Sequence, residues 1–331
     1  MGLEEIRGLV AADLKAVDGV IRTRLGSSVP LVSTVAEHIV AGGGKRLRPL
    51  IVLLSAHAAA SPKTLTGSHH HEAAAFIEFI HTATLLHDDV VDHSAMRRGR
   101  DTANALFGNE ASVLVGDFVY SRAFQMMAAI GVPRVMEIMA DATNVIAEGE
   151  VLQLMNAQDP DTTEERYLEV IHRKTAKLFE AGAEVAAVLA GADRTVQTAL
   201  ATYARHLGAA FQLIDDVLDY RSDPASRGKN LGEDLAEGKM TLPLIHAYQH
   251  GSHADRELIH DVVLAAGMED RTQPDLGRIL EAIDTSGGIQ YTRERALAES
   301  GAAMAALAPV TASRFRDALA ELASVAVERD R

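Results

Sequence analysis

Two acidic segments with the same internal spacing offer the clearest chemistry in the sequence. The first, HDDVVD at 87–92, and the second, LIDDVLD at 213–219, each follow a run of apolar residues. Residues four apart share a helix face, so the first and last aspartates of each segment point the same way. Carboxylates at a helix C-terminus are unfavourable without a cation, and Mg²⁺ combines one or two carboxylates with phosphate oxygens. One segment alone could be a solvated helix end, but two copies predict clusters that hold Mg²⁺ around a diphosphate.

Basic residues stand where they could complete such an anion site. The run GGGKRLRP at 42–49 places Lys45 and Arg48 after three glycines, which let a backbone approach an anion closely. Arg97 and Arg98 follow the first acidic segment, although cations near a helix C-terminus also have a simple dipole explanation. Further candidates are Lys174, Lys229 and Lys239. The last two belong to a glycine-bearing loop that could close over a bound substrate or be an ordinary mobile loop.

The elements that carry these residues are predicted to be helices almost throughout. Apolar residues recur at steps of three and four, as at 6–17 and 203–214. Aromatic residues make up only 4% of the chain. The stretch Asp161–Glu165 is typical of a capped helix start. We predict an all-α fold, a single domain over 1–331 that forms a bundle of ten or more helices with short connections.

The composition argues against several classes of protein. The chain of 331 residues contains no cysteine, which excludes disulfides, thiolate nucleophiles and Cys-ligated zinc. Its net charge of −14, without a basic tail, argues against a nucleic-acid partner. The acidic, amphipathic N-terminus is unlike a signal peptide, and no apolar run approaches the length of a membrane span. We therefore expect a cytoplasmic protein.

Two histidine features allow more than one interpretation. His87 next to Asp88 also occurs in HD phosphohydrolases, but those enzymes need further spaced ligands, so we interpret His87 as a satisfied core residue. The run His69–His71 could suggest a metal site. Because it stands at a loop-to-helix junction, we interpret it as a surface cap.

Five motifs, taken in order, resemble those of trans-isoprenyl diphosphate synthases. They are GGGKRLRP, HDDVVDHSAMRRG, Lys174-Thr175, FQLIDDVLD and the loop with Lys229 and Lys239. GDFVYSRAFQMM and EGEVLQL look like the long-chain branch. The resemblance covers nearly the whole chain. It implies the isoprenoid synthase fold, an all-α bundle around a deep central cavity, commonly as a homodimer.

The resemblance also implies an activity. The expected enzyme is a Mg²⁺-dependent prenyltransferase that adds isopentenyl diphosphate to an allylic diphosphate such as farnesyl diphosphate. The expected product is an octaprenyl diphosphate for a quinone side chain, with nonaprenyl and decaprenyl lengths left open. Such a hydrophobic product implies at most transient membrane contact for its release. As many as three Mg²⁺ ions are expected, with Mn²⁺ as a substitute.

Carried over motif by motif, the resemblance gives the candidate residues separate roles. The isopentenyl diphosphate ligands would be Lys45, Arg48, His81 and Arg98. The Mg²⁺ ligands would be Asp88, Asp92 and Asp215, with Asp89, Asp216 and Asp219 acting through water or as neighbours. The allylic diphosphate would contact Arg97, Lys174, Lys239 and the nearby Lys229. Thr175 and Gln212 would face the reacting carbons.

Product length is expected to depend on the residues one helical turn before Asp88. In the family, bulky aromatics there stop growth early, whereas this chain has Ala83 and Thr84. The growing chain could then extend past Ile80. The alternative is that Ala83 only makes a tight helix–helix contact.

Three other functions are weaker interpretations of the same residues. A class I terpene cyclase would carry Asn, Ser and Glu in its second metal motif and would not need GGGKRLRP. A regulatory subunit of a heteromeric synthase would usually lose motif aspartates, and a helical scaffold would have no reason to gather charges at helix ends.

Overall fold

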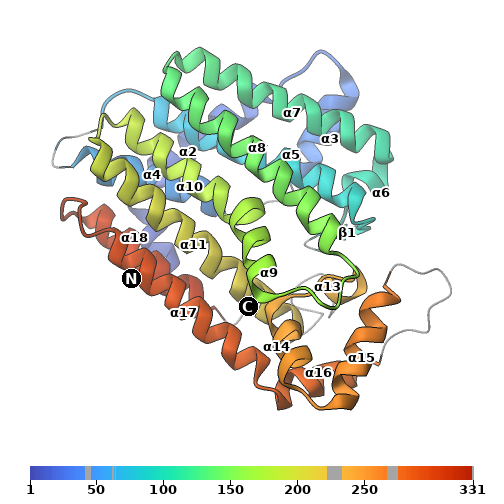
Figure 1. The fold of residues 1–331 in the computed structure, drawn as a ribbon. Coiled ribbons are helices and arrows are strands. Elements are labelled where there is room, and N and C mark those ends of the chain that lie inside the picture. Colours follow the sequence, from blue (N-terminus) through green and yellow to red (C-terminus); the bar gives the residue numbers. More distant parts are fainter. Residues whose placement is uncertain are drawn as a thin grey trace. The chain divides into compact units, whose positions relative to one another are not determined.

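The computed structural model describes residues 1–41, 46–61, 63, 65–97, 99–221, 233–266 and 275–329. In these ranges all regular secondary structure is helical apart from one short hairpin, so the all-α prediction is confirmed (Figure 1). The chain divides into two compact units, which we describe separately. The first comprises Met1–Thr143, Leu178–Ala204 and Met304–Leu322, and the second comprises Asn144–Lys177, Arg205–Ala303 and Ala323–Arg331. A single functional domain over 1–331 stays a prediction.

The first unit is organised around helix α5 (His69–Val91). This helix packs most extensively against α7 (Asn109–Ile130) and also contacts α2 (Ala11–Arg24), α4 (Leu47–Ala60) and α6 (Ala103–Phe107). Its residues Ala73–Ile77 are all inaccessible to solvent, as expected for a core helix that is apolar on nearly every side. The other elements wholly inside this unit are α1 (Leu3–Gly8), α2 (Ala11–Arg24), α3 (Pro30–Ala41), α4 (Leu47–Ala60), β1 (Met96–Arg97), β2 (Arg100–Asp101), α6 (Ala103–Phe107) and α7 (Asn109–Ile130).

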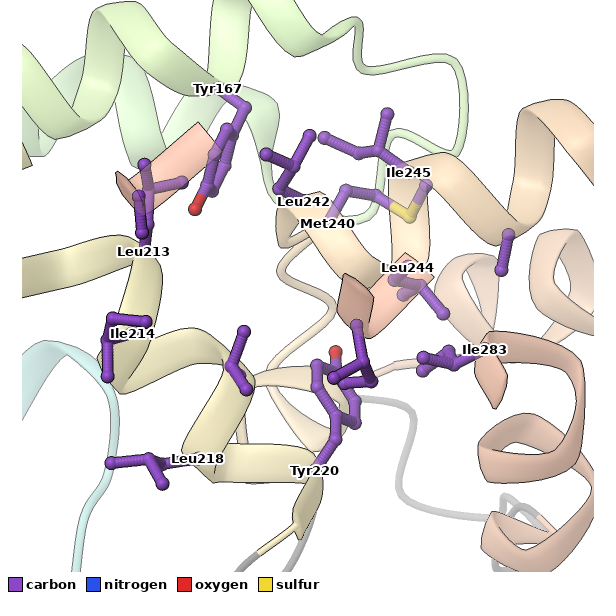
Figure 2. Close-up of a cluster of buried hydrophobic side chains, with 14 of the residues drawn as sticks. Tyr167, Leu213, Ile214, Leu218, Tyr220, Met240, Leu242, Leu244, Ile245 and Ile283 are labelled. Carbon is purple, nitrogen blue, oxygen red and sulfur yellow. The ribbon is translucent and has the colours of Figure 1, made fainter. Parts of the chain in front are cut away.

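The second unit has its own apolar core, shown in Figure 2. There Leu213, Ile214 and Leu218 of α11 (Arg194–Arg221) belong to one buried cluster with Tyr167 and Leu242. The predicted helix start at 161–165 is confirmed: α9 begins at Glu164, and the Thr163 hydroxyl accepts from the Arg166 amide. Elements inside this unit are α9 (Glu164–Val170), η1 (Ile171–Ala176), α13 (Glu233–Ala236), α14 (Leu242–His250), α15 (His253–Leu264) and α16 (Leu276–Thr285).

Five helices contribute residues to both units. They are α8 (Pro133–Asn156), α10 (Lys177–Leu189), α11 (Arg194–Arg221), α17 (Gly288–Ala306) and α18 (Arg314–Val327). Within the described part of the chain, one helix, α7, is long and apolar enough to cross a membrane by length and composition alone.

Candidate active site

The first acidic segment forms the C-terminal end of α5, which stops in a defined way. His93 adopts the left-handed conformation with φ of 52°, and the Ser94 amide donates to the Asp89 carbonyl at 3.0 Å. The His93 amide donates to the Val90 carbonyl at 3.3 Å, which completes a Schellman motif. Asp88 and Asp92 are both half-buried, whereas Asp89 is only 5% exposed. The expected separation of Asp89 from the face that Asp88 and Asp92 share is therefore observed.

Asp89 anchors the short hairpin that follows the helix. One of its carboxylate oxygens accepts from Arg97 Nε at 2.8 Å and lies 2.7 Å from Arg97 Nη2. The side-chain amide of Asn104 donates to the backbone carbonyls of Asp89 and Ser94. Asp89 is thus held by protein partners. Its ion-pair partner Arg97 is the residue predicted to contact the allylic diphosphate. Arg98, Lys45 and Lys229 lie outside the described residues.

Two further candidates for isopentenyl diphosphate binding are in the first unit. His81 lines a pocket together with Arg46 and Glu78. Arg46 and Glu78 form an ion pair with an N–O distance of 2.7 Å. The Arg48 guanidinium lies 4.6 Å from the centre of the Phe179 ring, in a cation–π arrangement. Arg46 was not a candidate from the sequence, although it stands inside GGGKRLRP.

The second acidic segment repeats the division between a buried and a more exposed aspartate. Asp216 is 3% exposed and accepts hydrogen bonds from the Tyr167 hydroxyl and, at 2.8 Å, from Gln212 Nε2. Burial and the neighbouring Asp234 raise the pKa of Asp216 well above its ordinary value. The Thr175 hydroxyl donates to Gln212 Oε1 at 3.2 Å. The structure thereby brings together Thr175, Gln212 and Asp216, and it adds Tyr167, which no motif in the sequence had indicated.

Asp215, the predicted metal ligand of this segment, already lies beside a cation. Arg329 Nη2 is 3.2 Å from Asp215 Oδ1 and 3.3 Å from the Phe211 carbonyl. The same guanidinium stacks 4.0 Å from the Phe211 ring centre. The Asp215 carboxylate therefore lies beside one positive charge, that of Arg329. Sequence reasoning missed Arg329 because nothing near it resembles a motif.

Two candidate lysines of the second unit, Lys174 and Lys239, are paired with glutamates. Lys174 Nζ is 2.6 Å from Glu150 Oε2, and Lys239 forms an ion pair with Glu237. Lys174 belongs to a short π-helical turn, η1, and such turns are frequent at functional sites. A side chain on Gly149 would lie 2.8 Å from the Lys174 amide, so this glycine permits α8 to approach η1 closely. The EGE sequence at 148–150 thus has a packing role and an electrostatic role.

The residues expected to set product length are inside the first unit. Ala83 and Ile80 are fully buried, and the half-buried Thr84 donates its hydroxyl to the His81 carbonyl at 2.9 Å.

His87, the histidine next to Asp88, contacts helix α7. Its Nε2 lies 3.3 Å from the Val113 carbonyl oxygen. His87 is satisfied by this contact to α7 and also lies 3.3 Å from Asp117 Oδ1, but its side chain is 35% exposed, so the prediction that it is a core residue is wrong. Gly116 gives its ring the necessary space.

The available donors suit a hard divalent cation. Asp88, Asp92 and Asp215 offer carboxylate oxygens that are only partly buried, the ligand type that Mg²⁺ prefers. The arginine beside Asp215 shows that this carboxylate accepts a cationic neighbour. These residues fit the expected metal.

Comparison with known proteins decides the family. Residues 29–278 match the family model described as Polyprenyl synthetase. The chain belongs to the polyprenyl synthetase family. Its members include the octaprenyl diphosphate synthase of Escherichia coli (strain K12), which is 51% identical over 331 residues and 100% of both chains.

Two other family members illustrate the range of similarity. The all-trans-nonaprenyl-diphosphate synthase (geranyl-diphosphate specific) of Rhodobacter capsulatus is 43% identical, over 98% of this chain and 98% of its own. A crystal structure of polyprenyl synthase from Caulobacter crescentus CB15, complexed with calcium and isoprenyl diphosphate, has a TM-score of 0.93. It is 43% identical and covers 100% of this chain and 98% of its own. The fold is accordingly the all-α isoprenoid synthase fold, and the chain is a prenyltransferase.

Proposed function

We propose that this polyprenyl synthetase makes a long all-trans polyprenyl diphosphate, of octaprenyl length, from isopentenyl diphosphate and an allylic diphosphate. The observation that carries the proposal is the repeated arrangement of the two acidic segments. In each, one aspartate is buried and held by protein partners, while a neighbouring aspartate is more exposed. The full-length identity of 51% to an octaprenyl diphosphate synthase supports the choice of product.

Each side chain has a defined task in this proposal. When bound at Asp88, Asp92 and Asp215, Mg²⁺ supplies Lewis acidity that stabilises the charge on the leaving diphosphate. Arg97, Lys174 and Lys239 bind the allylic diphosphate. Their carboxylate partners keep these cations oriented before the substrate arrives.

The remaining polar groups act near the reacting carbons. The allylic C–O bond breaks and its electron pair leaves with pyrophosphate, and the isopentenyl double bond then forms the new C–C bond. Thr175 and Gln212 direct oxygen dipoles toward the positive charge that develops, and Asp216 fixes the Gln212 amide. The proton that is lost goes to the released pyrophosphate, so the protein needs no nucleophile of its own.

Several finer expectations form part of the same proposal. Lys45, Arg48, His81 and Arg98 bind isopentenyl diphosphate. The chain acts as a homodimer in the cytoplasm, as one domain over 1–331, and its product serves a quinone. Exposed apolar side chains on α7, such as Leu114 at 68%, support association with a second copy. The Caulobacter relative, solved with calcium and isoprenyl diphosphate, supports a divalent cation beside a diphosphate.

The test is incubation of the purified chain alone with farnesyl diphosphate, labelled isopentenyl diphosphate and Mg²⁺. We expect octaprenyl diphosphate by reversed-phase chromatography, loss of turnover with excess chelator, and recovery with Mg²⁺ or Mn²⁺. A cyclic hydrocarbon would indicate a terpene cyclase instead. No product from a folded chain, with activity restored only by another subunit, would indicate a regulatory protein.

A further inference from the structure

Four polar side chains from three helices converge in the first unit, at the end of α5 remote from Asp88. His71 Nε2 lies 2.8 Å from Asp13 Oδ1, and His70 Nε2 lies 3.5 Å from the same oxygen. His57 Nε2 lies 3.0 Å from Asp13 Oδ2. Asp13 comes from α2 and His57 from α4. Phe315 stacks on the His57 ring, with 4.5 Å between centroids.

This arrangement overturns the interpretation of the histidine run as a surface cap. Only His69 is exposed. The His70 side chain is 6% exposed, and both His70 and His71 turn toward Asp13 although they are neighbours in sequence. Neighbouring side chains on a helix normally diverge by about 100°. Here their ring centroids are 4.0 Å apart, so the packing directs both imidazoles to one point.

Burial and the contacts inside the cluster shift the pKa values of two of its members. Burial, followed by the charge on His71, lowers the pKa of His70 to about 4, so its imidazole is neutral at pH 7. Burial would raise the pKa of Asp13, but hydrogen bonds from His71 and His57 outweigh it and hold this pKa below its ordinary value.

We propose that Asp13, His70 and His71 form a binding site for a divalent transition metal ion, Zn²⁺, that is separate from the aspartate segments. One ligand atom from each of these residues lies within 4.8 Å of the other two, which permits a common ion. Two imidazoles with one carboxylate suit Zn²⁺, whereas Mg²⁺ takes oxygen ligands. His57 holds the second carboxylate oxygen and so orients the ligand, as partners of metal ligands commonly do.

The site ties α2 to the start of α5. In the metal-free protein two imidazoles share a single carboxylate oxygen, at 2.8 and 3.5 Å. A bound ion replaces that crowded contact with three ligand bonds. Because an ion that binds only the folded chain stabilises it, Zn²⁺ raises the melting temperature without entering the transferase reaction.

The test uses a tag-free chain from which metal ions have been removed with a chelator. The chain carries Asp88→Asn and Asp215→Asn, so that ions do not bind to these two proposed Mg²⁺ ligands. Titration calorimetry with Zn²⁺ is expected to give one ion per chain. His71→Gln and His70→Gln each weaken binding by about 100-fold or more, and His57→Gln weakens it by roughly 10–100-fold. His69→Gln is the matched control, because its imidazole is exposed outside the cluster, and it leaves affinity unchanged.

Co²⁺ gives a second readout that does not depend on the variants folding. Bound by Asp13, His70 and His71, it produces the intense visible absorption of a four-coordinate ion with nitrogen ligands, and Zn²⁺ displaces it. Only weak octahedral bands, or a loss of Zn²⁺ binding in His69→Gln equal to that in His71→Gln, would overturn the proposal. Neither readout measures prenyl transfer, so the result is independent of the proposed function.

Discussion

Changing Asp88 or Asp89 to asparagine is predicted to affect different properties of the protein. Asp89→Asn lowers stability, whereas Asp88→Asn lowers turnover. Asp89 has a side chain that is 7% exposed, and one of its oxygens receives two N–H groups from Arg97, whose side chain is 27% exposed. Hydrogen bonds to charged groups contribute about 1.5–3 kcal/mol, and water compensates part of the loss at the exposed arginine. Asp89→Asn is therefore expected to lower the free energy of unfolding by about 2 kcal/mol.

Asp88→Asn is expected to change stability by less than about 1 kcal/mol, because the residue is only half-buried at a helix end. The loss of the Asp88 carboxylate instead lowers turnover. Metal-assisted charge stabilisation amounts to several kcal/mol, which corresponds to a decrease of about a thousandfold in kcat. Asp89→Asn retains turnover to within about tenfold, provided that the assay temperature lies below its melting transition.

Urea denaturation followed by circular dichroism measures the first quantity, and the isopentenyl transfer assay measures the second. A double-mutant cycle between Asp89→Asn and Arg97→Gln is expected to give a coupling energy of about 1 kcal/mol or more. Equal stability of the two asparagine variants, together with a coupling near zero, would refute the assignment of Asp89 as the anchor of the hairpin.

Three further predictions concern packing, pH and product length. Gly149→Ala places a methyl group 2.8 Å from the Arg173 Cβ and is expected to cost about 1–3 kcal/mol in urea denaturation. Burial and then the charge on His250 lower the pKa of His246, so the stability that its neutral form contributes is present above pH 6.5 and is lost as pH falls below it. Ala83→Tyr is expected to shorten the product in the transfer assay, because it narrows the proposed path of the growing chain.

Each of these predictions has an internal control. Gly19→Ala, in a helix with open space around the glycine, is expected to increase stability by about 0.5–1 kcal/mol. The urea midpoint should change less between pH 7.5 and pH 5.5 in His246→Gln than in His253→Gln. His253 is the control because its imidazole is exposed. If Ala83→Tyr lowers the melting temperature but leaves product length unchanged, Ala83 is a packing contact and the proposed path is wrong.

The sequence predicted those features that depend on local periodicity. Apolar spacing predicted the helices, and the four-residue step predicted that Asp88 and Asp92 share a face from which Asp89 departs. The stretch Asp161–Glu165 predicted a helix start, and α9 begins at Glu164. These predictions are confirmed because each depends only on residues within about two helical turns of one another.

Features that depend on distant segments were not predictable in this way. Arg329 stacks on Phe211, more than a hundred residues earlier in the chain, and no spacing in the sequence relates the two positions. Tyr167 is an ordinary apolar position of α9 until tertiary packing brings its hydroxyl to Asp216. The histidine run was misinterpreted for the same reason, since Asp13 stands on another amphipathic helix.

The two acidic segments reveal why a pair of adjacent aspartates is useful at a helix end. Consecutive residues diverge on a helix, so when one carboxylate points outward, its neighbour points into the protein. Inside, Asp89 is fixed by a guanidinium and Asp216 by a hydroxyl and an amide. The same physical requirement, a buried carboxylate that must find donors, is met by unrelated partners in the two units. Each anchor then restricts the helix end that carries the more exposed carboxylate, so a metal ligand would be held in place before any ion or substrate binds.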